Sequence, residues 1–192
     1  MNRRCLGILM AAAVLLVAAG MPAVAEVKLP GIFAPHMVLQ RDLAIPVWGW
    51  ANPGEKVSVS LAGQTEQATA DPQGKWSVEL APIADPGPYT LTVKGDNTIE
   101  IPDVLAGEVW LASGQSNMAM TVSRCKDIEQ ETAAANHPRI RMFTVARTPA
   151  ETPQDNVQGS WQVCSRETVG GFSATAYFFG RELEKELDVP VG

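Results

Sequence analysis

A Gly-x-Ser-Asn turn at residues 114–117 has the residue types and the order that nucleophilic chemistry needs. It follows a continuous apolar run at 109–112, which is typical of a strand buried on both faces of a parallel sheet. Residues 117–136 contain no proline or glycine and are rich in alanine and glutamate, so they predict a helix. A serine at such a strand-to-helix turn stands at the carboxyl edge of the sheet, where free helix N–H groups can stabilise a developing oxyanion. Ser116 is therefore a candidate nucleophile.

The alternative is that Ser116 only caps the helix, a position that serine often takes. The wider run LAGEVWLASGQSNM closely resembles the nucleophile segment of the sialate O-acetylesterase family, which are carbohydrate esterases within the SGNH (GDSL-like) hydrolases. Two more stretches resemble the same family, FAPHMVLQRDLAIPVWGWANPGEKVSV and WQVCSRETVGGFSATAYFFGRELEKELDVPVG. The resemblance implies that Ser116 is the catalytic nucleophile. It also implies a loop for the nucleophile and the oxyanion, made of Gly114, Gln115, Ser116 and Asn117.

The reaction implied by the resemblance is the serine-dependent removal of O-acetyl groups from sialic acid or a related acetylated sugar, without a cofactor. In SGNH esterases a histidine base usually follows an aspartate by three residues, and a glycine N–H and an asparagine side chain from later loops complete the oxyanion hole. Neither His36 nor His137 has this aspartate, because Phe33 and Ala134 stand three residues before them. We therefore expect the amino-terminal part of a longer esterase, inactive alone. The competing hypotheses are a natural truncation without activity and a carbohydrate-binding β-sandwich module with a vestigial esterase segment.

Residues 1–25 resemble a secretory signal peptide. Arg3 and Arg4 precede an apolar run at 6–19, and residues 23–25 offer a small-x-small cleavage site. The expected location is therefore secreted or periplasmic, with no membrane attachment after cleavage. The remaining 167 residues hold 13 basic and 21 acidic side chains, a formal charge of −8. Such a surface argues against nucleic acid and anionic membranes as partners, but it does not select a substrate. The expected partner, an acetylated sugar or glycan, is implied by the family resemblance alone.

Residues 26–102 predict an all-β module, because short alternating runs are separated by turn sequences. We expect a small β-sandwich, and the family resemblance implies that it serves as a scaffold. Trp48 and Trp50 lie two apart and so share one face of their strand, with Trp76 available from a later strand. They could stack on sugar rings, but such residues more often fill a sandwich core, and core packing is the interpretation that we favour. His36 is expected to have a structural place at a turn.

Residues 103–192 predict strand, helix and strand in alternation, with a boundary near Pro102-Asp103. The resemblance implies the first, incomplete part of an SGNH α/β domain, with a flavodoxin-like parallel sheet. Further elements are predicted along it: a strand at 140–145, a surface loop at 146–158 and a helix at 170–187 with Ser173 as its cap. The apolar residues of this helix recur at intervals of three and four and predict one buried face: Phe172, Ala176, Phe179, Leu183 and Leu187.

Cys125 and Cys164 remain after the predicted cleavage, in a chain sent to an oxidising compartment. If they pair, they close a loop of about 40 residues, worth about 4 kcal/mol in the chain-entropy estimate. The other reading, held open, is that both are small buried hydrophobic residues. No CxxC or Cys/His ligand spacing occurs, so the sequence gives a metal site no support.

Overall fold

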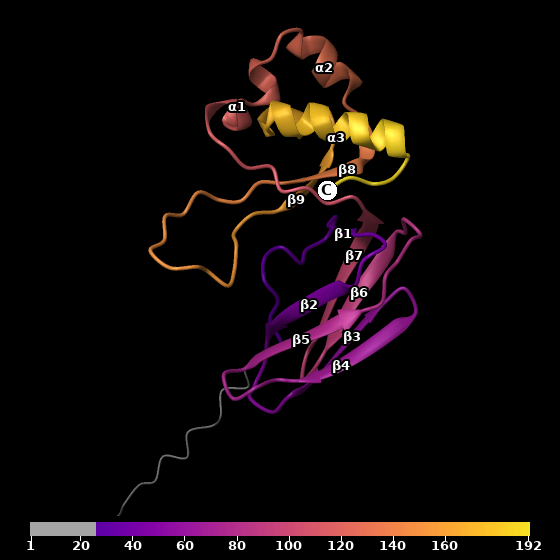
Figure 1. Cartoon of the computed structure of the whole chain (residues 1–192), viewed down its shortest axis with the longest axis vertical. Helices are drawn as coiled ribbons and strands as arrows, with labels where there is room; N and C mark the ends of the chain where they lie inside the picture. The colour runs from indigo at the N-terminus through magenta and orange to yellow at the C-terminus, as the bar shows by residue number, and fades with distance from the viewer. Residues whose placement is uncertain (1–25) are drawn as a thin grey trace, which may run out of the picture.

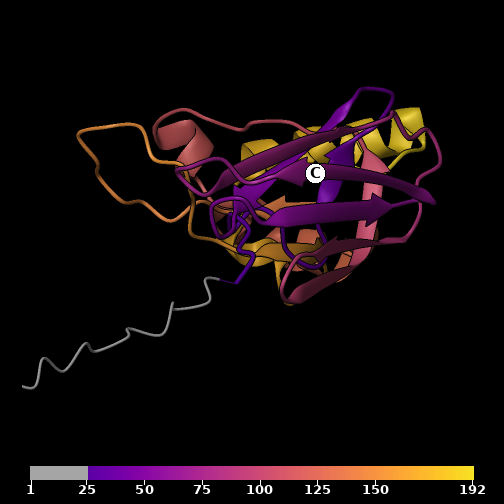
Figure 2. The same ribbon diagram turned by 90° about the horizontal axis from the view of Figure 1, so that it is seen from below.

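A computed structural model describes residues 26–192, so the predicted signal peptide lies outside the described residues. Figure 1 shows two units along the long axis of the molecule. The β unit, residues 26–107, holds strands β1 to β7, and the α/β unit, residues 108–192, holds the helices with β8 and β9. In Figure 2, seen from below, the strands of the β unit lie in front of helix α3.

The β unit is built on a mixed five-stranded sheet in the order β1-β7-β6-β3-β4, in which only β1 and β7 are parallel. Strands β2 and β5 form a separate antiparallel pair. The bounds of the seven strands are β1 Val38–Gln40, β2 Ile45–Trp50, β3 Lys56–Leu61, β4 Gln64–Thr69, β5 Lys75–Leu80, β6 Tyr89–Lys94 and β7 Thr98–Gly107. Strand β4 lies beside β5, so the mixed sheet curls into a half-barrel. The structure thus shows a mixed, curled sheet beside a separate strand pair, and the predicted β-sandwich is not confirmed.

One core fills the β unit because its strands alternate strictly between inward apolar and outward polar residues. Val57, Val59 and Leu61 enter this core from β3, and Val47 and Leu80 enter it from the β2–β5 pair. Each such side chain is nearly inaccessible to water, and burying one contributes roughly 1.5–3 kcal/mol. The core therefore holds the two sheets together and gives the α/β unit a rigid base.

The predicted boundary at Pro102-Asp103 falls inside strand β7, which continues to Gly107. The pairing of β6 with β7 shifts register at this point, because Leu91 pairs with Ile101 while Tyr89 pairs with Val104. Asp103 has a φ of 55°, which bends the strand locally. The break in the sequence pattern thus marks a β-bulge, and the chain changes unit only after Gly107.

The α/β unit places helix α3 (Ala174–Leu187) over the antiparallel pair of β8 (His137–Phe143) and β9 (Trp161–Cys164). Among the described residues of the α/β unit, parallel pairing is limited to Val191, which bridges Glu108 on one side and Ile140 on the other. The predicted parallel sheet is thus present only as these bridges among residues 26–192. Tyr177 of α3 is completely buried in the core of this unit.

The apolar run at 109–112 does not form the predicted buried strand. The backbone N–H of Trp110 donates to the Gly192 carbonyl, yet Trp110 is 53% exposed and Leu111 is 91% exposed. An apolar run predicts burial only where other elements cover both faces. Within the described residues, the backbone of this run bonds to the 190–192 segment along one edge.

The predicted helix at 117–136 is divided into three short pieces: α1 (Ser116–Ala119), the 3-10 helix η1 (Val122–Arg124) and α2 (Ile128–Ala134). Met120 and Cys125 are extended, and Asp127 takes the left-handed conformation. Thr121 forms a β-bridge with Ser173 in place of continuing the helix. Tertiary pairing has overridden a helical propensity that is weak at Thr121.

Helix α3 has the predicted Ser173 cap, whose Oγ accepts a hydrogen bond from the Ala176 N–H at 3.3 Å. Its predicted buried stripe is wrong, because Phe179 and Leu187 are about half exposed. The buried side is the one that carries Ala174, Tyr177 and Gly180, and it packs towards β8. The helix has apolar residues on two sides, and periodicity alone selected the wrong one.

Cys125 and Cys164 are free thiols that belong to the same apolar cluster of the α/β unit. No helix in the described part of the chain is both long and apolar enough to cross a membrane.

Candidate active site

Ser116 is the first residue of helix α1 and lies on the surface, as do all residues from 111 to 117. The turn before it is compact: a Cβ on Gly114 would lie only 3.2 Å from the Cβ of Met118. A larger residue at position 114 would therefore push on the first turn of α1. Ser116 itself is exposed and so is accessible from solvent.

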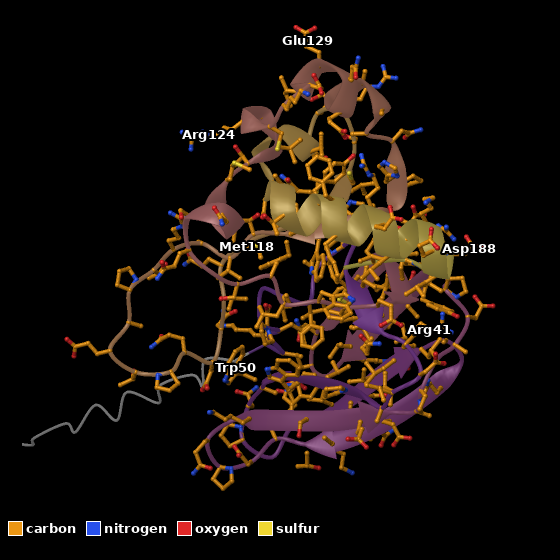
Figure 3. All side chains as sticks on the ribbon, turned by 45° about the horizontal axis from the view of Figure 1, so that its top comes forward. Arg41, Trp50, Met118, Arg124, Glu129 and Asp188 are labelled. Atoms are coloured by element: carbon orange, nitrogen blue, oxygen red, sulfur yellow. The ribbon has the colours of Figure 1, made fainter. Side chains whose placement is uncertain are left out.

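The amino terminus of helix α3 holds the Ser116 turn in place. Thr175 Oγ1 donates to the Asn117 carbonyl at 3.1 Å, and Ser173 Oγ donates to Met118 Sδ at 3.3 Å. The Ala174 N–H donates to the Met120 carbonyl at 2.8 Å. Figure 3 labels Met118 beside the end of the α3 ribbon. These bonds hold the short helix α1, which begins at Ser116, against α3, the longest helix of the described residues.

His36 belongs to a cluster with Asp103 and Arg141, and no hydrogen bond joins it to Ser116. Its Nδ1 lies 2.6 Å from Asp103 Oδ2, and Arg141 Nη1 donates to the same oxygen at 2.6 Å. Arg141 is buried, and its Nε also donates to the Pro138 carbonyl. The hydrogen bond from Arg141 is the main cause that lowers the pKa of Asp103. The cluster joins a loop of the β unit, β7 and β8, which agrees with the structural role expected for His36.

His137 also has an acidic partner, because its Nδ1 lies 3.8 Å from Glu184 Oε2 of helix α3. Its ring packs edge-on to Tyr177, with centroids 6.2 Å apart. Within residues 26–192, no hydrogen bond joins the Ser116 hydroxyl to a histidine or to any other side chain. The described chain thus presents the candidate nucleophile Ser116 without a base hydrogen-bonded to it.

The expected oxyanion stabilisation by a long helix needs correction. Helix α1 has four residues, so it lacks the aligned peptide dipoles of the predicted helix at 117–136. What remains is local: the first N–H groups of any helix have no partner within it, and here they follow Ser116 directly. Gly114 and Gln115 precede helix α1, Ser116 and Asn117 begin it, and all four are exposed. Their role in binding the nucleophile and the oxyanion stays a prediction.

Sequence reasoning did not foresee the cluster of His36, Asp103 and Arg141. These residues lie 38 and 67 positions apart in the chain, and no spacing rule connects them. The positive φ values of His36 and Asp103, 71° and 55°, are the local signs that each residue occupies a special position. Within the described residues, no three His, Cys, Asp or Glu side chains are grouped as a metal ion would require.

Comparison with known proteins gives a consistent result. No family model matches the chain. Sialate O-acetylesterase of Mus musculus is 33% identical over 181 residues, covering 82% of this chain and 33% of that protein. The protein of the same name from Homo sapiens is 33% identical over 180 residues, covering 81% and 34%. The crystal structure of a carbohydrate acetylesterase from Xanthomonas citri matches with a TM-score of 0.84 and 40% identity, covering 86% of this chain and 39% of that one.

These likenesses relate the chain to the carbohydrate esterases, in sequence and in fold. More narrowly, they confirm the resemblance to the sialate O-acetylesterase family that three stretches of the sequence indicated. The chain spans about a third of the length of the curated relatives that it matches.

Proposed function

We propose that this chain carries the nucleophile of a serine-dependent carbohydrate O-acetylesterase that acts on sialic acid or a related acetylated sugar. The observation that carries the proposal is the exposed Ser116 turn, fixed against the amino terminus of α3, in a chain related to carbohydrate esterases. The finer architecture, a β-sandwich followed by the first part of an SGNH domain, is part of the same proposal. So is a secreted or periplasmic location.

In the proposed reaction, Ser116 Oγ attacks the carbonyl carbon of the acetyl ester while a base removes the hydroxyl proton. Negative charge collects on the carbonyl oxygen, next to the free N–H groups that follow Ser116 in the first turn of α1. The sugar oxygen leaves with the proton from the base, and the acetyl group stays on Ser116. Water, deprotonated by the same base, then releases acetate and restores the serine.

The base belongs, in this proposal, to residues beyond the present 192. His36 and His137 are both paired with carboxylates, and the relatives are about three times as long as the stretch they share with this chain. Reading the open reading frame past Gly192 for an Asp-x-x-His sequence is the first test. Its absence would favour the carbohydrate-binding module with a vestigial esterase segment.

The second test uses the 192-residue chain itself on a simple aryl acetate, where we expect no hydrolysis above background. A serine hydroxyl without its base is a weak nucleophile, and loss of the base alone costs on the order of a million-fold in a serine protease. Hydrolysis that disappears in both Ser116→Ala and His36→Ala would contradict the external base. It would make the present chain a complete enzyme.

The third test uses the full-length protein, meaning the gene product that continues these residues, and measures acetate release from acetylated sugars. Ser116→Ala should abolish turnover and leave the melting temperature nearly unchanged, because the hydroxyl is exposed and has no side-chain partner among the described residues. Ser113→Ala is the matched control, since Ser113 is exposed in the same loop and should tolerate the change. Turnover of Ser116→Ala within tenfold of the parent would rule out the assignment.

A further inference from the structure

A groove of about 580 Å³ runs over the outward face of the β2–β5 pair, away from the Ser116 turn. Its lining includes the aromatic Trp48 and Trp50, the charged Asp71 and Lys75, and the loop residues Gln154 and Asp155. None of its lining residues comes from the exposed nucleophile loop at 111–117.

The two tryptophans face outward because β2 alternates. Ile45, Val47 and Gly49 are buried, so Trp48 and Trp50 lie on the opposite side, roughly 7 Å apart along the strand. Trp48 is 39% exposed, whereas Trp76 of β5 points into the core at 4%. The expected core position is therefore right for Trp76 and wrong for Trp48. Trp48 is exposed and Trp50 is half-buried, and both line the groove.

The second wall of the groove comes from the α/β unit. The loop that follows β8 extends to one side between β9 and β2 in Figure 1 and projects beyond the strands in Figure 2, and Figure 3 labels Trp50 near it. Asp155 Oδ2 lies 2.7 Å from Lys75 Nζ, and Asn156 Oδ1 accepts the Gly31 N–H at 2.8 Å. These two contacts connect the loop to the β unit at the edge of the groove.

The chemistry of the lining selects the occupant. Tryptophan faces suit the apolar C–H faces of sugar rings, and the surrounding carboxylates, amide and hydroxyl supply both donors and acceptors for sugar hydroxyls. The single lysine is already paired with Asp155, and Asp71 adds another negative charge. The groove therefore disfavours an anionic sugar such as a sialic acid.

We propose that this groove binds a neutral stretch of a glycan chain, at a site separate from the Ser116 turn. It would hold a glycan by its backbone sugars while the ester lies elsewhere on the molecule. The proposal does not depend on Ser116 being the nucleophile, since binding here requires no chemistry at the serine.

The test is binding of the 192-residue chain to an immobilised panel of neutral oligosaccharides, including xylan fragments, with sialylated oligosaccharides alongside. The strongest neutral binder is then titrated by calorimetry. Trp50→Ala and Trp48→Ala should each weaken that affinity at least tenfold. Gln154→Ala should weaken it less. Trp110→Ala is the matched control, because Trp110 is an exposed tryptophan outside the groove, and it should leave the affinity unchanged.

Trp48 packs edge-on to Phe33, with centroids 4.8 Å apart, so its variant is accepted only if it keeps the parent's circular dichroism. If it unfolds, Trp50→Ala and Gln154→Ala decide the test. Ser116→Ala should bind like the parent, which separates this site from the proposed catalytic one. Any of three results would overturn the proposal: no binding to a neutral glycan, a preference for the sialylated ones, or an equal loss in Trp50→Ala and Trp110→Ala.

Discussion

The ion pair between Asp103 and Arg141 joins the two units, and Asp103→Asn tests how much it contributes to stability. The Arg141 side chain is only 6% exposed and donates to both carboxylate oxygens of Asp103, at 2.6 and 3.3 Å. Asparagine keeps the shape of aspartate and tolerates the φ of 55° at this position. The change therefore removes one charge and leaves a buried guanidinium without its counterion.

The size of the effect follows from the burial of the pair. Removing one partner of a buried ion pair costs about 3–5 kcal/mol. The Asp103 side chain is 36% exposed, and nearby water screens the charge, which places the cost at the lower end. For a chain of this length, about 3 kcal/mol lowers the melting temperature by roughly 6–12 °C.

Asp42→Asn is a closely matched control, because Asp42 has a φ of 58° and pairs with Arg41 at 2.6 Å. That pair lies at the surface, with Asp42 54% exposed, and such pairs contribute about 0–1 kcal/mol. Thermal unfolding followed by circular dichroism at pH 7 compares the two variants with the parent. Equal shifts for both would refute the idea that burial of Arg141 gives the Asp103 pair its strength.

The same pair should make stability depend on pH in a defined direction. The hydrogen bond from Arg141 lowers the pKa of Asp103 below its ordinary 3.8, so its contribution is complete above that value. The contribution is lost as the pH falls through the lowered pKa. The gap in stability between the parent and Asp103→Asn should thus be present at pH 5 and narrow below about pH 4. A gap that widens on acidification would contradict this assignment.

Two further predictions concern helix α3 and the core of the α/β unit. Ser173→Ala should cost about 1 kcal/mol through loss of the cap on α3 and so lower the melting temperature by about 2–4 °C. Ser123→Ala, at an exposed site, should change the melting temperature by less. Equal effects would contradict the capping role of Ser173. Burial raises the pKa of the Cys164 thiol from 9.0 to about 11, so the free energy of unfolding should fall as the pH rises through that window. In Cys164→Ala, the free energy of unfolding should fall less between pH 9 and 11 than in the parent. Urea unfolding at several pH values measures this, and the same fall in both proteins would show that the Cys164 thiol does not cause it.

Local patterns predicted the β unit well, because each of its strands has one face in a single core. Val57, Val59 and Leu61 show the two-residue period that one buried face imposes. The period does not say which of two apolar faces is buried, however. In β2 the core takes Ile45 and Val47 and leaves Trp48 outside, although tryptophan is the larger apolar side chain.

The α/β unit was harder to predict because tertiary contacts decide its local structure. Thr121 leaves the helical conformation to pair with Ser173, a partner 52 residues away that no local pattern indicates. Helix α3 is apolar on two sides, and burial follows Tyr177, which packs into the core, while Phe179 packs on the exposed Trp110. The Ser116 turn itself could be found from sequence, because its glycine, serine and asparagine are adjacent and resemble a known family.

The proposed role of Ser116 is tested most directly by finding which residue carries the acetyl group during turnover. The full-length protein would be mixed with excess acetylated sugar, quenched in acid within milliseconds and digested for peptide mass spectrometry. We predict an added acetyl group on Ser116, absent from Ser116→Ala and present in Ser113→Ala. Turnover with the acetyl group on another residue, or undiminished turnover in Ser116→Ala, would contradict it.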